Sequence, residues 1–198
     1  MRSFVLFGLG AALTVPAMAQ ADRLPVTPLA HEKMADFARC VVRASPAKAH
    51  SALTRDFRTT AYRHELRVLA ANNMSCMDKG GMRAGGLPFA AAMAEALLRQ
   101  GDGPLNVRLV RAAATDAPTY APSDAVAMCV ARSVPDQVAA LFIAPIASET
   151  EVAAAAALGL AISKCTPPGV DVELAPFALR SILATASYRL LAAAGAAR

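Results

Sequence analysis

The sequence predicts an all-α protein of two tandem helical repeats, each with three to four short helices stapled by a disulfide. Alanine, the strongest helix former, supplies 48 of the 198 residues, whereas Trp is absent. Residues 38–46 match residues 127–135 without a gap, and the four cysteines form two pairs with the same separation of 36 residues. With 56% apolar residues the chain can bury a core, which excludes intrinsic disorder.

The internal repeat follows a shift of 89 residues. This shift carries Cys40 onto Cys129, and it also carries Leu69 onto Leu158 and Cys76 onto Cys165. Beyond the second cysteine the register is open, because residues 87–90 match at a shift of 88 and residues 94–99 match at a shift of 90. We therefore assign residues 31–100 to repeat 1, residues 101–121 to a linker and residues 122–194 to repeat 2.

The N-terminus has the pattern of a secretory signal peptide. Arg2 is followed by twelve uncharged residues (4–15), then by Pro16 and an A-x-A site that ends at Ala19. Twelve residues are too few for a membrane-spanning helix, which needs about 20, so a membrane anchor is the weaker interpretation. We expect cleavage of residues 1–19 after Ala19, with the mature chain in the periplasm or secreted and without a transmembrane segment.

Local signals place the helices within each repeat. Pro46 and Pro135 are each suited to the first position of a helix, and Tyr62, Leu66 and Leu69 recur on one helix face. Residues 148–151 form a capping box before the apolar run 152–162, residues 74–86 have the glycines of a loop, and a closing helix follows Pro88 and Pro176. We expect residues 152–162 and residues 177–197 to form buried or half-buried helices. Residues 105–110 of the linker fit either a short strand or one to two helical turns.

The cysteines are the strongest chemical signal. Export places them in an oxidising compartment, and no C-x-x-C or Cys/His cluster with zinc spacing is present. A unit that folds before it is duplicated carries its own bond, which favours Cys40–Cys76 and Cys129–Cys165 among the three connectivities. We therefore expect two structural disulfides rather than a metal or redox site.

No catalytic constellation stands out in the sequence. His64-Glu65 is similar to a zinc-protease motif, but Val68 occupies the position of the second histidine, so His31, His50 and His64 are expected as ordinary imidazoles. There is no nucleophile elbow and no Walker-type loop, and no metal or cofactor is predicted. The glycines near Lys79 and Arg83 suit an anion cradle less well than a flexible connector.

Charge is distributed unevenly between the repeats. Residues 31–101 hold 11 basic and 6 acidic residues, whereas residues 121–198 hold 5 basic and 6 acidic residues. Much of the excess comes from Arg55, Arg58, Arg63 and Arg67, which are a candidate face for an acidic protein or envelope component. The alternative is an ordinary solvated helix face. Nucleic acid is excluded as a partner, because aromatic residues make up only 5% of the chain and do not interleave with the basic ones.

Two short motifs resemble a known group of proteins. Residues 37–43 with Pro46, and residues 94–99, are similar to uncharacterised secreted Cys-repeat proteins of alphaproteobacteria, of the sphingomonad type. This chain departs from their pattern at Leu98, where Tyr is usual, and at Thr185 and Ser187 in the second copy. The resemblance implies export but no activity and no catalytic residues.

Two function classes follow from these observations. The first is a non-enzymatic binding or structural module of the cell envelope, which the duplication and the structural disulfides favour. The second is a small-ligand carrier or an enzyme with a site between the two repeats. In that case four methionines are candidate lining residues, although methionines at this spacing are more often core fillers: Met74, Met77, Met82 and Met93.

Overall fold

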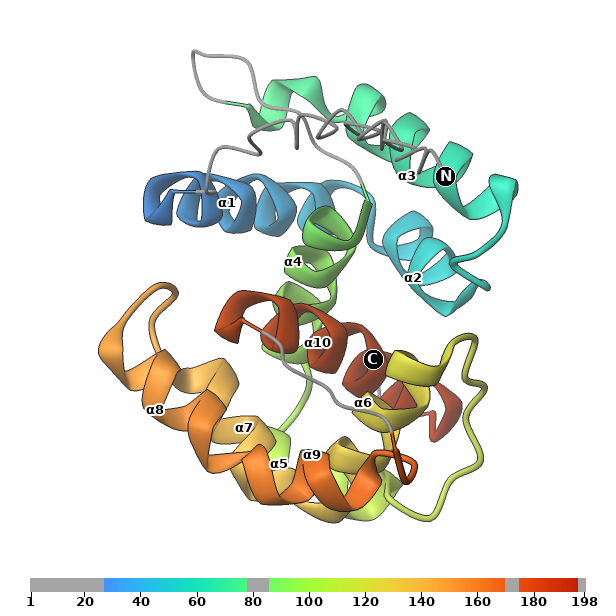
Figure 1. Ribbon diagram of the computed structural model, residues 1–198. Coiled ribbons are helices and arrows are strands. Elements are labelled where there is room, and N and C mark those ends of the chain that lie inside the picture. The colour runs from blue at the N-terminus through green and yellow to red at the C-terminus, as the bar shows by residue number, and fades with distance from the viewer. Residues whose placement is uncertain (1–26, 78–85, 170–174, 196–198) are drawn as a thin grey trace, which may run out of the picture.

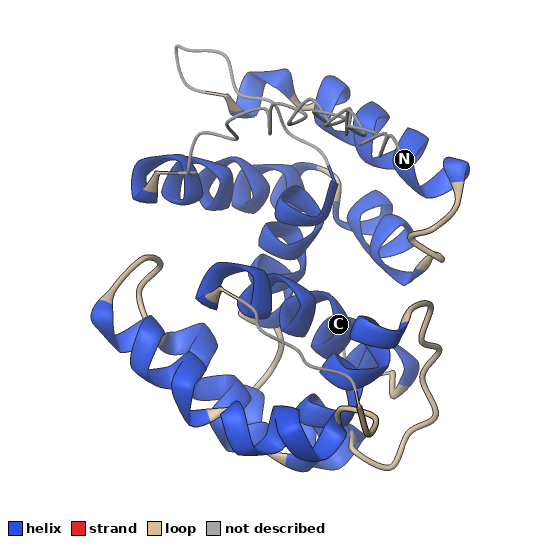
Figure 2. Ribbon diagram, in the orientation of Figure 1, coloured by secondary structure: helices blue, strands red, loops and turns tan. Residues whose placement is uncertain are grey.

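The computed structural model describes residues 27–77, 86–169 and 175–195, and every regular element in these ranges is helical (Figures 1 and 2). The all-α fold class predicted from the sequence is confirmed. Repeat 1 contains α1 (Pro28–Ala44), α2 (Pro46–Thr54), α3 (Thr60–Asn72), the 3-10 turn η1 (Met74–Cys76) and α4 (Gly86–Leu98). The linker forms α5 (Leu105–Ala112). Repeat 2 contains α6 (Pro122–Ser133), α7 (Pro135–Ile143), α8 (Glu149–Ala157), α9 (Gly159–Cys165) and α10 (Pro176–Ala193).

Equivalent helix starts have equivalent backbones. Ser45 (φ −141°, ψ 55°) and Val134 (φ −137°, ψ 57°) precede the prolines that open α2 and α7, although neither side chain makes a capping hydrogen bond. At the same shift of 89 residues, Thr59 and Ser148 cap α3 and α8, and each hydroxyl accepts a hydrogen bond of 3.1 Å from the third residue of its helix. The repeat is therefore visible in local geometry as well as in sequence.

Each repeat is closed by one disulfide. Cys40 of α1 is bonded to Cys76 of η1, and Cys129 of α6 is bonded to Cys165 at the end of α9, with Cα–Cα distances of 5.6 and 5.7 Å. This is the pairing that the duplication favours. In both repeats the bond ties the first helix to the end of the segment that precedes the closing helix.

The closing helices α4 and α10 form the centre of the molecule. They pack against each other, with α1–α3 on one side and α6–α9 on the other (Figure 1). The order of buried and half-buried positions in residues 89–98 recurs without change in residues 179–188. The closing helices therefore align at a shift of 90, which answers the register question left open by the sequence.

One continuous core extends through both repeats. Its largest fully buried side chains include Phe37, Phe89, Phe142 and Tyr188, and small alanines fill the spaces between the helices. Burial raises the pKa of Tyr188 to about 12, so its hydroxyl stays protonated.

The linker is helical and is fixed by a buried arginine. Arg108 of α5 is only 5% exposed, and its Nη1 donates to the carbonyl of Leu98 at 2.7 Å. A Cβ at Gly101 would lie 2.0 Å from the guanidinium carbon of Arg108, so a side chain there would displace the arginine. The strand alternative for residues 105–110 is wrong, because this contact needs the helical turn that points Arg108 back at α4.

Repeat 2 departs from repeat 1 in the segment that corresponds to α3. There the helix breaks at Leu158, before Gly159, and gives α8 and α9. Residues 152–162 are half-buried, because Ala155, Leu158 and Ala161 are buried whereas Val152 and Leu160 are 55% and 69% exposed. In an alanine-rich segment the faces of the helix differ too little in polarity for the sequence to show which face is exposed.

Among the described residues no single helix is long and apolar enough to cross a membrane. Helices α6 and α7 reach that length only as a pair, and they are bent by 102° at their junction.

The disulfides are expected to make nearly equal contributions to stability. Each closes a loop of the same length, and loop entropy assigns a loop of this size about 3–4 kcal/mol. Replacing Cys40 and Cys76 by Ala, or Cys129 and Cys165 by Ala, should therefore lower the unfolding free energy by a similar amount in guanidinium titrations. A double variant with the parent's stability would contradict a structural role for that bond.

Candidate functional site

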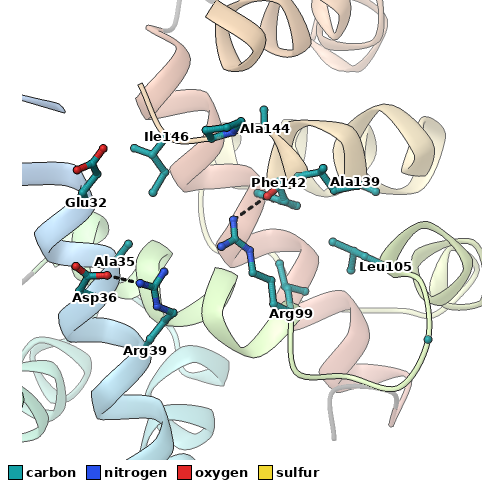
Figure 3. Close-up of a pocket in the computed structure, with 14 residues that line it drawn as sticks. Glu32, Ala35, Asp36, Arg39, Arg99, Leu105, Ala139, Phe142, Ala144 and Ile146 are labelled. Atoms are coloured by element: carbon teal, nitrogen blue, oxygen red, sulfur yellow. Dashed lines mark hydrogen bonds and ion pairs between the residues drawn. The ribbon is translucent and has the colours of Figure 1, made fainter. Parts of the chain in front are cut away.

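A groove of about 600 Å³ lies between the two repeats (Figure 3). One wall is α1 of repeat 1, the other is α7 and the turn that follows it in repeat 2, and the end of α4 lies between them. The apolar part of the lining includes Leu98, Leu105, Ala139, Phe142, Ile143 and Ile146. Its charged part consists of Glu32, Asp36, Arg39 and Arg99.

Arg99 is the central charged group of the groove (Figure 3). It directly follows α4, and its Nη2 donates to the carbonyl of Phe142 at 2.8 Å and is ion-paired with Glu95. The side chain is 45% exposed, and within the described part of the chain its Nε and Nη1 make no hydrogen bond. Arg99 thus bridges the two repeats while part of its guanidinium faces the groove.

A buried ionic cluster lies directly behind Arg99. Arg180 of α10 donates from Nε and Nη2 to the Glu95 carboxylate, at 2.8 and 2.5 Å, and from Nη1 to Glu151 Oε1 at 3.1 Å. Its guanidinium also donates to the carbonyls of Ala144 and Phe142, at 3.0 and 3.3 Å. The cluster therefore joins α4, α8, α10 and the end of α7, which together position the wall of the groove.

Arg180 is charged despite its burial. Burial alone disfavours the charged guanidinium, but the hydrogen bonds and charge of Glu95, together with those of Glu151, outweigh it and raise the pKa of Arg180 above its ordinary value. With Arg99 included, two guanidiniums face two carboxylates, so the cluster is neutral overall.

Glu151 also accepts a hydrogen bond from the turn before α8. Its Oε2 accepts from the backbone N–H of Ala147 at 2.6 Å, while Ser148 accepts from the N–H of Glu151. Ala147 has φ 59°, a left-handed conformation that non-glycine residues adopt rarely. The capping box predicted from the sequence is thus present in half: Ser148 caps the helix, but the Glu151 carboxylate bonds Ala147 and Arg180 instead of Ser148.

The charged residues of α1 form the opposite rim. Asp36 and Arg39 are ion-paired with each other, and Glu32 lies about one helical turn before Asp36 (Figure 3). Both arginines of the lining, Arg39 and Arg99, therefore already have a carboxylate partner, Asp36 and Glu95 respectively.

The four arginines singled out in the sequence lie elsewhere, on α3 and on the loop before it. All four are exposed, and none lines the groove. Arg55 is paired with Glu65 at 2.5 Å and Arg58 with Asp56 at 2.7 Å. Hydrogen bonds from Arg58 lower the pKa of Asp56 below its ordinary value.

Arg63 and Arg67 differ from this first pair. Arg63 donates to the Thr60 hydroxyl at 3.1 Å, and no carboxylate among the described residues pairs with Arg63 or Arg67. The compensated half of the predicted basic face is therefore Arg55 and Arg58, and the uncompensated half is Arg63 and Arg67.

The histidines are dispersed. His31 stacks on Phe177, with ring centroids 3.7 Å apart, and burial lowers its pKa below the ordinary value. His50 Nδ1 lies 2.7 Å from the Tyr188 hydroxyl, and His64 is exposed on α3. Within the described ranges no three His, Cys, Asp or Glu side chains gather as a metal site.

The three described methionines among the candidate lining residues do not line the groove, and two of them fill the core, which is the alternative the sequence favours. Met93 is fully buried in α4, Met77 packs against the core, and Met74 is exposed. The groove is lined instead by aliphatic and aromatic side chains of both repeats. Several predictions concern residues outside the described ranges: Met82, Lys79, Arg83, the nearby glycines before Gly86 and residues 1–19, which are predicted as a signal peptide.

Comparison with known proteins gives no match: no protein-family model, curated protein or solved structure is similar to this chain.

Sequence reasoning missed Glu95 as the partner of Arg99, and it missed Arg180 and Glu151 as the other members of the cluster behind it. Glu95 and Arg99 appear in the sequence only as parts of a repeated motif. A usable signal was present, because Glu95, Arg180 and Arg189 are charged residues within two largely apolar closing helices. Charges in such a setting are kept only when they are paired.

Proposed function

We propose that this chain is an exported, non-enzymatic binding protein of the bacterial cell envelope and that the groove between its repeats holds a small ligand. The two disulfides are compatible with an extracytoplasmic location. The leader pattern with cleavage after Ala19 and the resemblance to secreted alphaproteobacterial proteins support the periplasm or the exterior as the destination.

The main support for this proposal is the size and lining of the groove. Its volume of about 600 Å³ falls within the usual size range of small-molecule sites, and both repeats contribute to its lining. Its apolar wall buries hydrocarbon, while a few charged groups fix orientation. Because the buried ionic cluster holds the surrounding helices, the groove is formed before any ligand arrives.

Binding suits the charged lining better than catalysis does. Asp36 is paired with Arg39, and Arg99 is held by Glu95 and the Phe142 carbonyl. General acid–base chemistry depends on groups that exchange protons near the working pH. Guanidiniums keep their proton throughout, so they serve to recognise and orient.

The groove is expected to bind 1-anilinonaphthalene-8-sulfonate, an aromatic anion whose fluorescence rises in apolar sites. Ile143 lines the groove and is 82% exposed, so Ile143→Asp removes apolar lining with little effect on folding. Full burial of such a side chain contributes about 1.5–3 kcal/mol, and about 1.4 kcal/mol corresponds to tenfold in affinity. We expect the Kd of the probe to rise about tenfold or more.

Leu160→Asp is the matched control for this experiment. Leu160 is 69% exposed on α9, it does not line the groove, and the substitution is of the same kind. Equal weakening by both variants, or no saturable binding to the parent, would contradict a ligand site in the groove.

We propose the uncompensated part of the basic face as a second binding surface, for an acidic partner. Arg63 and Arg67 are exposed and lie one turn apart on α3. At the shift of 89, their counterparts in α8 are the uncharged Val152 and Ala156. The fold therefore forms without charge at these positions, which leaves the two arginines available for recognition.

Polyglutamate is a suitable acidic probe for this surface. Arg63→Gln with Arg67→Gln should weaken its binding, with the larger loss at low salt, while the unfolding free energy changes by about 0.5 kcal/mol or less. The control is Arg55→Gln with Arg58→Gln, which removes the same net charge from arginines that already have carboxylate partners. Unchanged binding in the first variant, or equal loss in both, would show that the face is only solvated surface.

A further inference from the structure

We propose that the ligand of the groove is an aromatic carboxylate whose carboxylate binds Arg99. This inference rests on the proposed function and specifies the class of small molecule. It comes from a second, smaller cleft on the molecule, which is related to the groove by the internal repeat and in which the protein's own side chains contact the arginine.

The two clefts are built on equivalent arginines. Arg189 of α10 is the counterpart of Arg99 at the shift of 90, and each arginine lies against the second helix of the other repeat. Arg99 reaches the Phe142 carbonyl of α7. Arg189 lines a cleft of about 220 Å³ together with His50 and Thr54 of α2.

Around Arg189 the protein supplies a carboxylate and two rings. Arg189 forms a buried ion pair with Asp124 of α6. Its guanidinium carbon lies 5.5 Å from the ring centroid of Tyr120 and 5.8 Å from that of Phe57. The Tyr120 hydroxyl donates to the Thr54 carbonyl at 3.3 Å, which fixes the ring in place.

Around Arg99 the equivalent positions hold mostly smaller residues, and its carboxylate partner is instead Glu95 of α4, which it shares with Arg180. Ala35 stands in the place of Asp124, and Ile146 in the place of Phe57. His31, the counterpart of Tyr120, stacks instead on Phe177. The hydrogen-bonded pair of His50 and Tyr188 is replaced by Ala139 and Leu98. The cavity is correspondingly larger, about 600 Å³ against about 220 Å³.

The contacts of Arg189 therefore indicate which chemical groups complement an arginine at this position of the repeat. A carboxylate matches the planar donors of a guanidinium, and an aromatic ring stacks against its face. The groove offers the arginine and the apolar walls but no carboxylate at position 35 and no ring beside the guanidinium. A ligand that brings both groups would add to Arg99, beside its ion pair with Glu95, carboxylate and ring contacts of the kind that Arg189 has.

The other charges at the groove are consistent with recognition by directed hydrogen bonds rather than by net charge. Asp36 and Arg39 compensate each other, Arg99 shares Glu95 with Arg180, and Glu32 adds one carboxylate at the rim. Discrimination should therefore depend on the shape and acceptor geometry of the carboxylate. It should not extend to every small anion.

The test compares 3-phenylpropionate with its neutral amide, 3-phenylpropionamide, by NMR titration of the ¹⁵N-labelled protein. The two probes differ only in the group that would meet Arg99. We expect the acid to bind at least tenfold more tightly than the amide, with the largest shift changes at Arg99 and Ala35.

Ala35→Asp is the decisive variant, because its carboxylate would imitate Asp124 and occupy Arg99. We expect it to abolish binding of the acid, while Ala35→Asn, which has nearly the same size and no charge, retains most of it. The comparison of acid with amide needs only the parent protein, so it decides the question even if Ala35→Asp does not fold.

Several outcomes would overturn the inference. They are equal affinity for acid and amide, no binding of either at millimolar concentration, and unchanged binding in Ala35→Asp. If the anilinonaphthalene probe still binds in a manner sensitive to Ile143→Asp, the groove remains a ligand site and only the ligand class is wrong. If that probe also fails, the proposed function fails with it.

Discussion

Arg180 lies between Glu95 and Glu151, and the arrangement of the two repeats depends on these three side chains. The core around them is rich in alanine, and such small side chains let helices approach closely. Because they interlock little, packing alone does not fix how two helices are aligned along each other. The guanidinium adds five donors in a rigid plane, and its carboxylate and carbonyl partners come from three other segments of the chain. Only one relative placement of α4, α8, α10 and the end of α7 satisfies all of them.

The same cluster makes the molecule asymmetric. The closing helices have identical burial patterns at a shift of 90, yet the counterpart of Arg180 is Ala90 and the counterpart of Glu95 is Thr185. The cluster of Glu95, Arg180 and Glu151 therefore lies to one side of the central helix pair, and the ion pair of Arg189 and Asp124 lies to the other. On the first side the groove around Arg99 is open, while on the other side Asp124, Tyr120 and Phe57 cover Arg189. The two clefts correspond through the internal repeat, and a few side-chain differences make the cleft around Arg99 the larger one.

Local features of the fold were predictable from the sequence. The prolines that open α2 and α7, the caps at Thr59 and Ser148 and the disulfides all depend on residues close in sequence or on the repeat itself. The inward face of α3 was equally visible, because Tyr62, Leu66 and Leu69 have helical spacing. The basic face could be located for the same reason.

The groove was not predictable, because it is made by contacts between distant segments. Glu95 and Arg180 are 85 residues apart, and Arg99 meets a backbone carbonyl 43 residues away, which no side-chain pattern records. The sequence of an alanine-rich helix also does not show which of its faces is exposed. The exposure of Val152 and Leu160 was missed for this reason. The correspondence between the two clefts became visible only when the helices had been placed in space.

The most direct test of this account is the unfolding free energy of Arg180→Met, measured beside Arg99→Met in guanidinium titrations. Arg180 is almost fully buried, so its loss leaves Glu95 and Glu151 without their shared partner, which costs about 3–5 kcal/mol in buried ion pairs. Arg99 is 45% exposed, and its loss should cost about 1 kcal/mol or less. If Arg180→Met unfolds within about 1 kcal/mol of the parent, the cluster does not hold the repeats together and the account is wrong.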